Sequence, residues 1–176
     1  MTNTGQNPSY LPPGPLVGLL CGAVAGAAGT SALNAVSYLD MVLRGRASSD
    51  TPSETVERLS EVSHVPVPGH GAARANRVAG LGPLLGLATG IGVGAALGLG
   101  RAAGWRPGPL LGGTAAALGA LVAANAPMAG LGVSDPRSWS AKDWISDLLP
   151  HAAYGAVTGW TLTALTPSGP AAIRPR

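Results

Sequence analysis

The sequence predicts an all-α integral membrane protein built as a four-helix transmembrane bundle, and three observations lead to this prediction. The run from Val78 to Gly100 has no charged residue, and as a helix it is long enough to cross a bilayer core of about 30 Å. Only 11% of the chain is charged, against about 25% in soluble domains. Glycines also recur in four-residue steps along the apolar segments, a spacing that lets membrane helices approach one another closely.

The glycine steps predict which helix faces pack together. In water each glycine costs a helix about 0.5–1 kcal/mol relative to alanine. In lipid the backbone has no other hydrogen-bond partner, so such a segment stays helical. We expect helix packing at these glycines: Gly18, Gly22, Gly26, Gly82, Gly86, Gly90, Gly94, Gly98, Gly155 and Gly159.

The apolar segments predict one membrane domain at residues 16–166, flanked by tails at 1–15 and 167–176. The first tail is rich in proline and has no charged side chain, which predicts disorder. Within the third helix, Asn125 and Pro127 predict a kink or an end, because proline removes a backbone donor. The four expected helices cover about 16–43, 78–100, 110–133 and 141–165.

The polar stretch after the first helix predicts a short amphipathic helix at about 52–63, lying on the membrane surface. Thr51 and Glu54 have the spacing of a capping box, with Thr51 at the N-cap. The apolar face consists of Val56, Leu59 and Val62. The segment from there to Arg77 predicts a loop. A second capping-box spacing, Ser140 to Asp143, precedes the fourth membrane helix.

The distribution of basic residues predicts the orientation. Four crossings place the loops 44–77 and 134–143 on one side of the membrane and both tails on the other. The loop side carries the larger number of basic residues: Arg44, Arg46, Arg58, Arg74, Arg77, Arg137 and Lys142. The tail side carries Arg101, Arg106, Arg174 and Arg176. By the positive-inside rule the loops are cytoplasmic and the termini lie outside.

One cluster of polar residues is predicted at membrane depth. Asp147, His151, Tyr154 and Thr158 share one face of the fourth helix because they are three or four residues apart. Ionisable groups inside membranes are costly and often functional, which favours a binding or transport site around His151. The alternative is structural: His151 and Tyr154 would then hydrogen-bond across helices to Asn34 or Asn125.

The chain lacks the residues that several classes of function require. The net charge of +3 is scattered, and no basic run suits nucleic acid. With Cys21 as the only cysteine, no thiolate metal cluster can form, and His64 and His70 fit no common ligand spacing. No nucleophile–base pair, phosphate-binding loop or dinucleotide fingerprint occurs. We therefore expect no catalytic site, no metal and no cofactor.

Several short motifs resemble those of uncharacterised bacterial inner-membrane proteins. These motifs are Ala28-Gly29-Thr30, Arg44-Gly45-Arg46 followed by Ser48-Ser49-Asp50-Thr51-Pro52, and His151-Ala-Ala-Tyr154-Gly155. The resemblance implies a small polytopic helical protein of the cytoplasmic membrane and implies no activity. We therefore expect a non-enzymatic membrane protein that packs with itself or with a membrane partner. A small transporter or channel with a polar site around His151 is the alternative, and a membrane enzyme comes third.

An internal echo suggests a duplicated helical hairpin. Gly86-Leu-Ala-Thr-Gly90 matches Gly155-Ala-Val-Thr-Gly159, and Gly29-Thr30-Ser31-Ala32 resembles Gly113-Thr114-Ala115-Ala116. Four crossings would give each matched pair of helices the same direction through the membrane, as parallel repeats require. Chance similarity in a chain so rich in glycine and alanine is the alternative.

Overall fold

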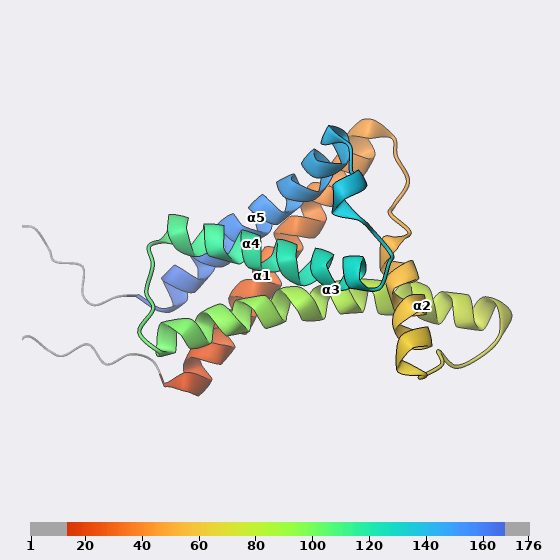
Figure 1. Ribbon diagram of the computed structural model, residues 1–176. Helices are drawn as coiled ribbons and strands as arrows, with labels where there is room; N and C mark the ends of the chain where they lie inside the picture. The colour runs from red at the N-terminus through yellow and green to blue at the C-terminus, as the bar shows by residue number, and fades with distance from the viewer. Residues whose placement is uncertain (1–13, 168–176) are drawn as a thin grey trace, which may run out of the picture.

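The computed structural model describes residues 14–167, and all regular structure within them is helical (Figure 1). The prediction of an all-α protein is confirmed. The predicted tails fall outside the described residues except at Gly14, Pro15 and Pro167. The helices are α1 (Pro15–Arg44), α2 (Thr51–Ser63), α3 (Gly71–Ala102), α4 (Pro109–Gly130) and α5 (Ala141–Leu165), with a short 3₁₀ turn at Pro136–Ser138.

Helix boundaries follow the sequence closely at α1 and α5 and depart from it at α3 and α4. The loop predicted up to Arg77 is wrong there, because α3 begins at Gly71. Alanine-rich sequence favours a helix in this segment, and Arg74 within it bonds to α2. Helix α4 passes through Pro127 and ends at Gly130, one turn earlier than predicted. The chain then turns at Gly132, whose φ of 70° suits glycine.

The two predicted capping boxes have different outcomes. At α5, Ser140 and Asp143 form the box: the Asp143 amide donates to Ser140 Oγ at 3.3 Å and the Ser140 amide donates to Asp143 Oδ2 at 2.9 Å. At α2 the box is absent, because Thr51 is already the first helical residue and Asp50 takes the N-cap position. The Thr51 hydroxyl instead accepts a hydrogen bond from Ser49 Oγ at 2.8 Å.

Helix α2 packs across the beginning of α3 (Figure 1). Val56 is buried with Val67 and Val78, which turns this part of the predicted apolar face toward the protein. The remaining apolar residues of that face stay outward, Leu59 at 42% and Val62 at 62% exposure. Their exposure leaves α2 an apolar edge for a membrane surface.

The long helices form two antiparallel pairs, α1 with α3 and α4 with α5, and α1 also packs against α5 (Figure 1). The start of α1, the α3–α4 connection and the end of α5 lie at one end of the molecule, the tail end. The α1–α2 and α4–α5 connections lie at the other, the loop end. This arrangement brings the predicted helix-packing faces together.

Glycine allows the backbones of α1 and α3 to touch. A Cβ on Gly22 would overlap the carbonyl of Gly94, and one on Gly94 would overlap the carbonyl of Gly22. The same relation holds between Gly18 and Gly98, and a Cβ on Gly26 would overlap the carbonyl of Gly90. Because any side chain at these positions would force the helices apart, their spacing sets the interhelical distance.

The α4–α5 pair uses the same device. A Cβ on Gly155 would overlap the carbonyl of Gly113, and one on Gly159 would meet the backbone of Gly113 at 2.5 Å. The two remaining predicted packing glycines differ. Gly82 faces Pro52 of α2 rather than a long helix, and Gly86 has nothing within 4 Å of where its Cβ would stand.

The buried and exposed side chains are distributed as in a protein surrounded by lipid. The buried hydrophobic residues between the long helices are mostly small, such as Ala25 and Ala116, both fully buried. Large aliphatic side chains point outward, for example Leu110 at 85% and Val42 at 78% exposure. In water such an apolar surface would be a liability, whereas in a bilayer it is the solvated face.

Three helices of the described chain, α1, α3 and α4, are long and apolar enough to cross a membrane. Helix α5 is not among them, and its first half carries Lys142, Asp143, Asp147 and His151. The fold therefore suggests a membrane-embedded protein with three apolar helices and a fourth, more polar one packed among them.

Candidate functional site

Helix α5 supplies the candidate polar site. Its inward face includes the buried residues Pro150, His151, Tyr154 and Thr158. Packing against both α1 and α4 encloses this face. The predicted polar residues of α5 therefore lie inside the bundle, with Asp147 at the edge, where its side chain is 23% exposed.

Asp147, His151 and Asn125 form one cluster near the loop end. Nδ1 of His151 lies 2.8 Å from the backbone oxygen of Asp147 and 3.4 Å from Asp147 Oδ1. A carbonyl only accepts hydrogen bonds, so this contact puts a proton on Nδ1. Asn125 Nδ2 of α4 donates to Asp147 Oδ2 at 2.9 Å. The cluster thus ties α4 to α5, and it leaves His151 without a direct bond to Asn125.

Tyr154 and Thr158 belong to a different contact, where α1, α3 and α5 meet. The Tyr154 hydroxyl is fully buried and donates to the backbone carbonyl of Gly90 at 2.6 Å. Thr158 is also fully buried, and its Oγ1 has no hydrogen-bond partner among the described residues. A Cβ on Gly29 would overlap this oxygen, so α1 lies directly against the pair.

Asn34 takes no part in either contact. It is exposed on α1, and none of the hydrogen bonds from His151 or Tyr154 reaches it. The six predicted polar residues therefore divide into a loop-end cluster of three, an interior pair of two, and one outward asparagine.

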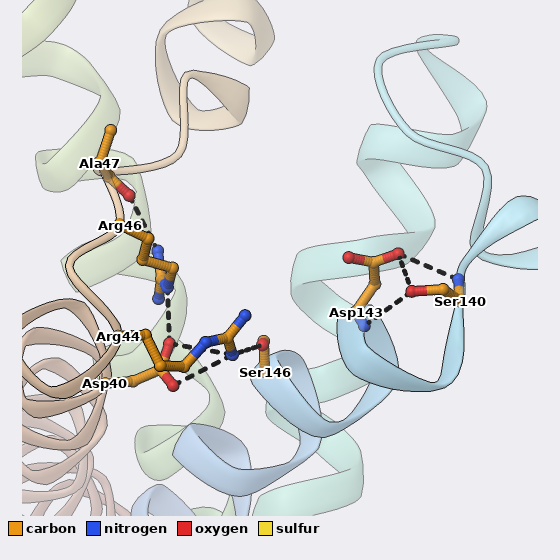
Figure 2. A network of polar contacts seen from close by, with 7 residues as sticks. All are labelled: Asp40, Arg44, Arg46, Ala47, Ser140, Asp143 and Ser146. Carbon is orange, nitrogen blue, oxygen red and sulfur yellow. Dashed lines mark hydrogen bonds and ion pairs between the residues drawn. The ribbon is translucent and has the colours of Figure 1, made fainter.

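A second polar network joins the end of α1 to the start of α5 (Figure 2). Asp40 accepts from Arg44 Nη1, one turn further along α1, at 3.1 Å and from Arg46 Nε at 2.5 Å. Arg44 Nη1 also donates to Ser146 Oγ at 2.7 Å. Local pattern did not indicate the bond of Arg44 to Ser146, because it depends on where α5 lies relative to α1, nor that of Arg46 to Asp40, which forms only because the chain turns after α1.

Open space occurs on the surface of the bundle. One hollow of about 630 Å³ lies between α2, the start of α3 and the turn after α4. In its wall both Nη atoms of the Arg74 guanidinium donate to the Glu57 carboxylate, which holds the pKa of Glu57 below its usual value. A second, apolar hollow of about 510 Å³ runs between α4 and α5. His151 lines neither of these two hollows.

Arg101 is a buried charged residue, and the sequence pattern did not predict that it would lie inside the protein. It marked the end of an uncharged span, but its side chain folds into the protein and is 2% exposed. Nη2 donates to Thr163 Oγ1 of α5 at 2.7 Å and to the carbonyl of Pro107 at 3.2 Å. Arg101 lies in the last turn of α3 and its partner Thr163 belongs to α5. Local sequence pattern could not predict this contact, because it depends on how the two helices are placed.

Within residues 14–167 no group of three His, Cys, Asp or Glu side chains is close enough to hold a metal ion. Comparisons with protein-family models, curated proteins and solved structures find no match to this chain. A function for this chain is therefore inferred from the chemistry and packing of the described residues.

Proposed function

We propose that this chain is a non-enzymatic, multi-pass protein of the bacterial cytoplasmic membrane that crosses the bilayer four times and assembles with itself or a membrane partner. The observation that carries the proposal is the backbone-to-backbone packing of α1 with α3 and of α4 with α5. Such packing makes a rigid body with lipid-facing surfaces on all long helices.

The fourth crossing is assigned to α5. At about 1.5 Å per residue its 25 residues extend roughly 37 Å, enough for a hydrocarbon core of about 30 Å. Its buried polar residues face the other long helices, whereas Trp160 and Leu149 point outward, where lipid would meet them. Trp139 and Trp144, in edge-to-face contact at 5.0 Å, suit an interface at that start.

Orientation follows from charge. The loop end carries most of the basic side chains and therefore faces the cytoplasm, with both termini outside. The resemblance of the sequence motifs to bacterial inner-membrane proteins supports the choice of membrane.

Self-assembly or partner binding is supported by three exposed glycines spaced around and along α3. Gly80, Gly86 and Gly92 have nothing within 4 Å of a built Cβ. The α3 backbone is therefore open to close approach by a helix of another chain.

A small transporter or channel is the second candidate, and the Asp147–His151–Asn125 cluster is the observation that favours it. There Nδ1 of His151 lies 3.4 Å from a carboxylate oxygen of Asp147, whose side chain is 23% exposed. The structural role is favoured, because Asn125 bonds α4 to Asp147 of α5 and His151 Nδ1 bonds to the backbone oxygen of Asp147.

Proton flux into proteoliposomes separates the two functions. We expect the native protein to show no flux above empty liposomes, and the same result for His151→Gln, which keeps hydrogen-bonding capacity but does not titrate near neutral pH. Flux through the native protein that disappears in His151→Gln would establish transport and refute the non-transporting role.

A further inference from the structure

The hollow of about 630 Å³ lies at the loop end, where three segments of the chain meet. Helix α2 packs across the beginning of α3 (Figure 1). The turn after α4 forms a third side, and a hydrogen bond from Arg58 Nε to the carbonyl of Leu131 at 3.2 Å ties this turn to α2. Small-molecule sites in proteins have volumes of about 300–1,000 Å³, so the hollow is large enough for a ligand.

The hollow has an apolar side and a charged side. Its apolar side comes from Ala75 and Val78 of α3 and from Val133 after α4. Ala75 and Val78 lie on one face of α3, because residues three apart share a helix face. The charged side is supplied mainly by α2. A ligand that fills the hollow therefore needs a hydrocarbon part as well as charge.

The two arginines that line the hollow are already paired within the chain. Both Nη atoms of Arg74 donate to the carboxylate of Glu57, which also lines the hollow. Nη1 of Arg58 donates to the carboxylate of Glu61 at 2.7 Å. Each guanidinium therefore has a glutamate as its counter-ion, and the charge that remains in the hollow is that of its other carboxylates.

Those carboxylates are Asp50 and Glu54, and both residues are exposed. Among the residues that the structure describes, neither carboxylate takes part in an ion pair or a hydrogen bond. The Glu54 amide donates to the Asp50 carbonyl at 3.0 Å, so the two lie one turn apart on the same face, where like charges repel. The start of a helix stabilises negative charge without neutralising it. The hollow therefore favours a cation from outside the chain.

We propose that the hollow binds a linear alkyl diammonium ion, the chemistry of a short polyamine, through the carboxylates of Asp50 and Glu54. Side chains one helical turn apart have Cβ atoms about 5–6 Å apart, a spacing that a chain of four methylene groups can match. Each ammonium group donates to one carboxylate, and the methylene groups displace water from the apolar side. A metal ion suits the hollow less, because residues 14–167 contain no group of three His, Cys, Asp or Glu side chains to hold one. By the orientation proposed above, the diammonium ion comes from the cytoplasm.

The test measures the stability of the full chain in a non-ionic detergent against three added ligands: butane-diamine with an amine at each end, butylamine and magnesium chloride. Thermal aggregation reports the concentration of each that half-saturates the protein, and a constant low ionic strength keeps screening the same. We expect the diamine to bind about fivefold more tightly than butylamine, the effect of one additional exposed ion pair. Magnesium should stabilise less than the diamine, because it makes no contact with the apolar side.

Three variants and one control locate the site. Asp50→Asn and Glu54→Gln should each remove the preference for the diamine, because its second ammonium group then has no carboxylate. Both positions are exposed, so both variants should fold. Asp135→Asn removes the same charge from the loop end at a residue that does not line the hollow, and it should keep the preference. Ala75→Phe fills the apolar side at an exposed position and should weaken the binding of both amines.

Equal binding of the two amines to the native protein would overturn the proposal, and so would a preference for the diamine that persists in both carboxylate variants. Stabilisation by magnesium equal to that by the diamine would assign the effect to charge alone and overturn the diammonium ligand. Undiminished binding of both amines to Ala75→Phe would overturn the placement of the alkyl chain in the hollow. Binding of an amine in detergent does not depend on the number of crossings or on proton flux, so its failure and that of the proposed function are separate results.

Discussion

Tyr154 connects three helices through a single side chain. It belongs to α5, its hydroxyl bonds to Gly90 of α3, and its ring lies where a Cβ on Gly29 of α1 would stand. The neighbouring Thr158 leaves its hydroxyl without a hydrogen bond, so Tyr154 provides the polar contact at this crossing.

Tyr154→Phe should destabilise the protein by about 0.5–1.5 kcal/mol, because it removes one buried hydrogen bond and preserves the ring. Tyr38→Phe is the matched control, since Tyr38 is 61% exposed. Thermal aggregation in detergent compares them. Equal stability of both variants with the native protein would mean that the bond to Gly90 contributes nothing.

The Glu57–Arg74 pair predicts a dependence on pH at the α2–α3 contact. Its bonds to Arg74 hold the pKa of Glu57 in the folded protein below its ordinary value of 4.5. The stabilisation is therefore complete above that ordinary value and is lost as the pH falls through the lower, folded pKa.

Glu57→Gln should accordingly lower the thermal midpoint at pH 7 and cease to matter in acid. Glu54→Gln is the control, because the Glu54 carboxylate makes none of the ion pairs at this contact. The same deficit for Glu57→Gln at pH 7 and at pH 3 would contradict an ionic contribution from Glu57.

At the scale of the element, two glycines on one helix should respond to alanine with opposite signs. Gly94→Ala places a methyl group against the carbonyl of Gly22, which should cost about 1–3 kcal/mol through overpacking. Gly86→Ala meets nothing within 4 Å and should stabilise α3 by about 0.5–1 kcal/mol. Thermal aggregation of the two variants provides the comparison, and effects of the same sign would contradict the assigned packing faces.

Local pattern predicted the elements better than their contacts. The capping box of Ser140 and Asp143 and the limits of α5 follow from residues adjacent in sequence, and both were predicted. The extra turns at the start of α3 were missed, because Arg74 gains its partner only when α2 folds back. Glycine spacing predicted a packing face but not its occupant, which is α2 at Gly82 and open surface at Gly86.

The candidate site was predicted in part for the same reason. Helical spacing placed His151, Tyr154 and Thr158 on one face of α5, and all three are buried. Their partners depend on helix order, which no local signal encodes: Tyr154 bonds to Gly90 rather than to an asparagine. Arg101 was missed because only the folded chain brings α5 and the first turn of α4 to it.

At the scale of the whole molecule, the two antiparallel pairs bear on the idea of a duplicated hairpin. Gly29 and Gly113, the first residues of one sequence echo, both face α5. Gly90 and Gly159 are the last residues of the other echo. Each faces the first helix of its own antiparallel pair: Gly90 meets α1 and Gly159 meets α4. The contacts of Gly90 and Gly159 support the duplication. The other echo positions do not, because Gly29 faces a helix of the other pair whereas Gly113 faces its own partner, and Gly86 is open whereas Gly155 packs against α4. The duplication stays a hypothesis.

The central claim is that the chain crosses the membrane four times with the loop end in the cytoplasm, and cysteine accessibility tests it most directly. Cys21 is the only thiol, so Cys21→Ala provides a background for single cysteines at Ser63, in the loop end, and at Ser168, after α5. With a membrane-impermeant reagent on intact cells and on inverted vesicles, we expect Ser63→Cys to react only from the cytoplasmic side and Ser168→Cys only from outside. Labelling of both from the same side would show that α3, α4 and α5 do not all cross, and the four-helix account would be wrong.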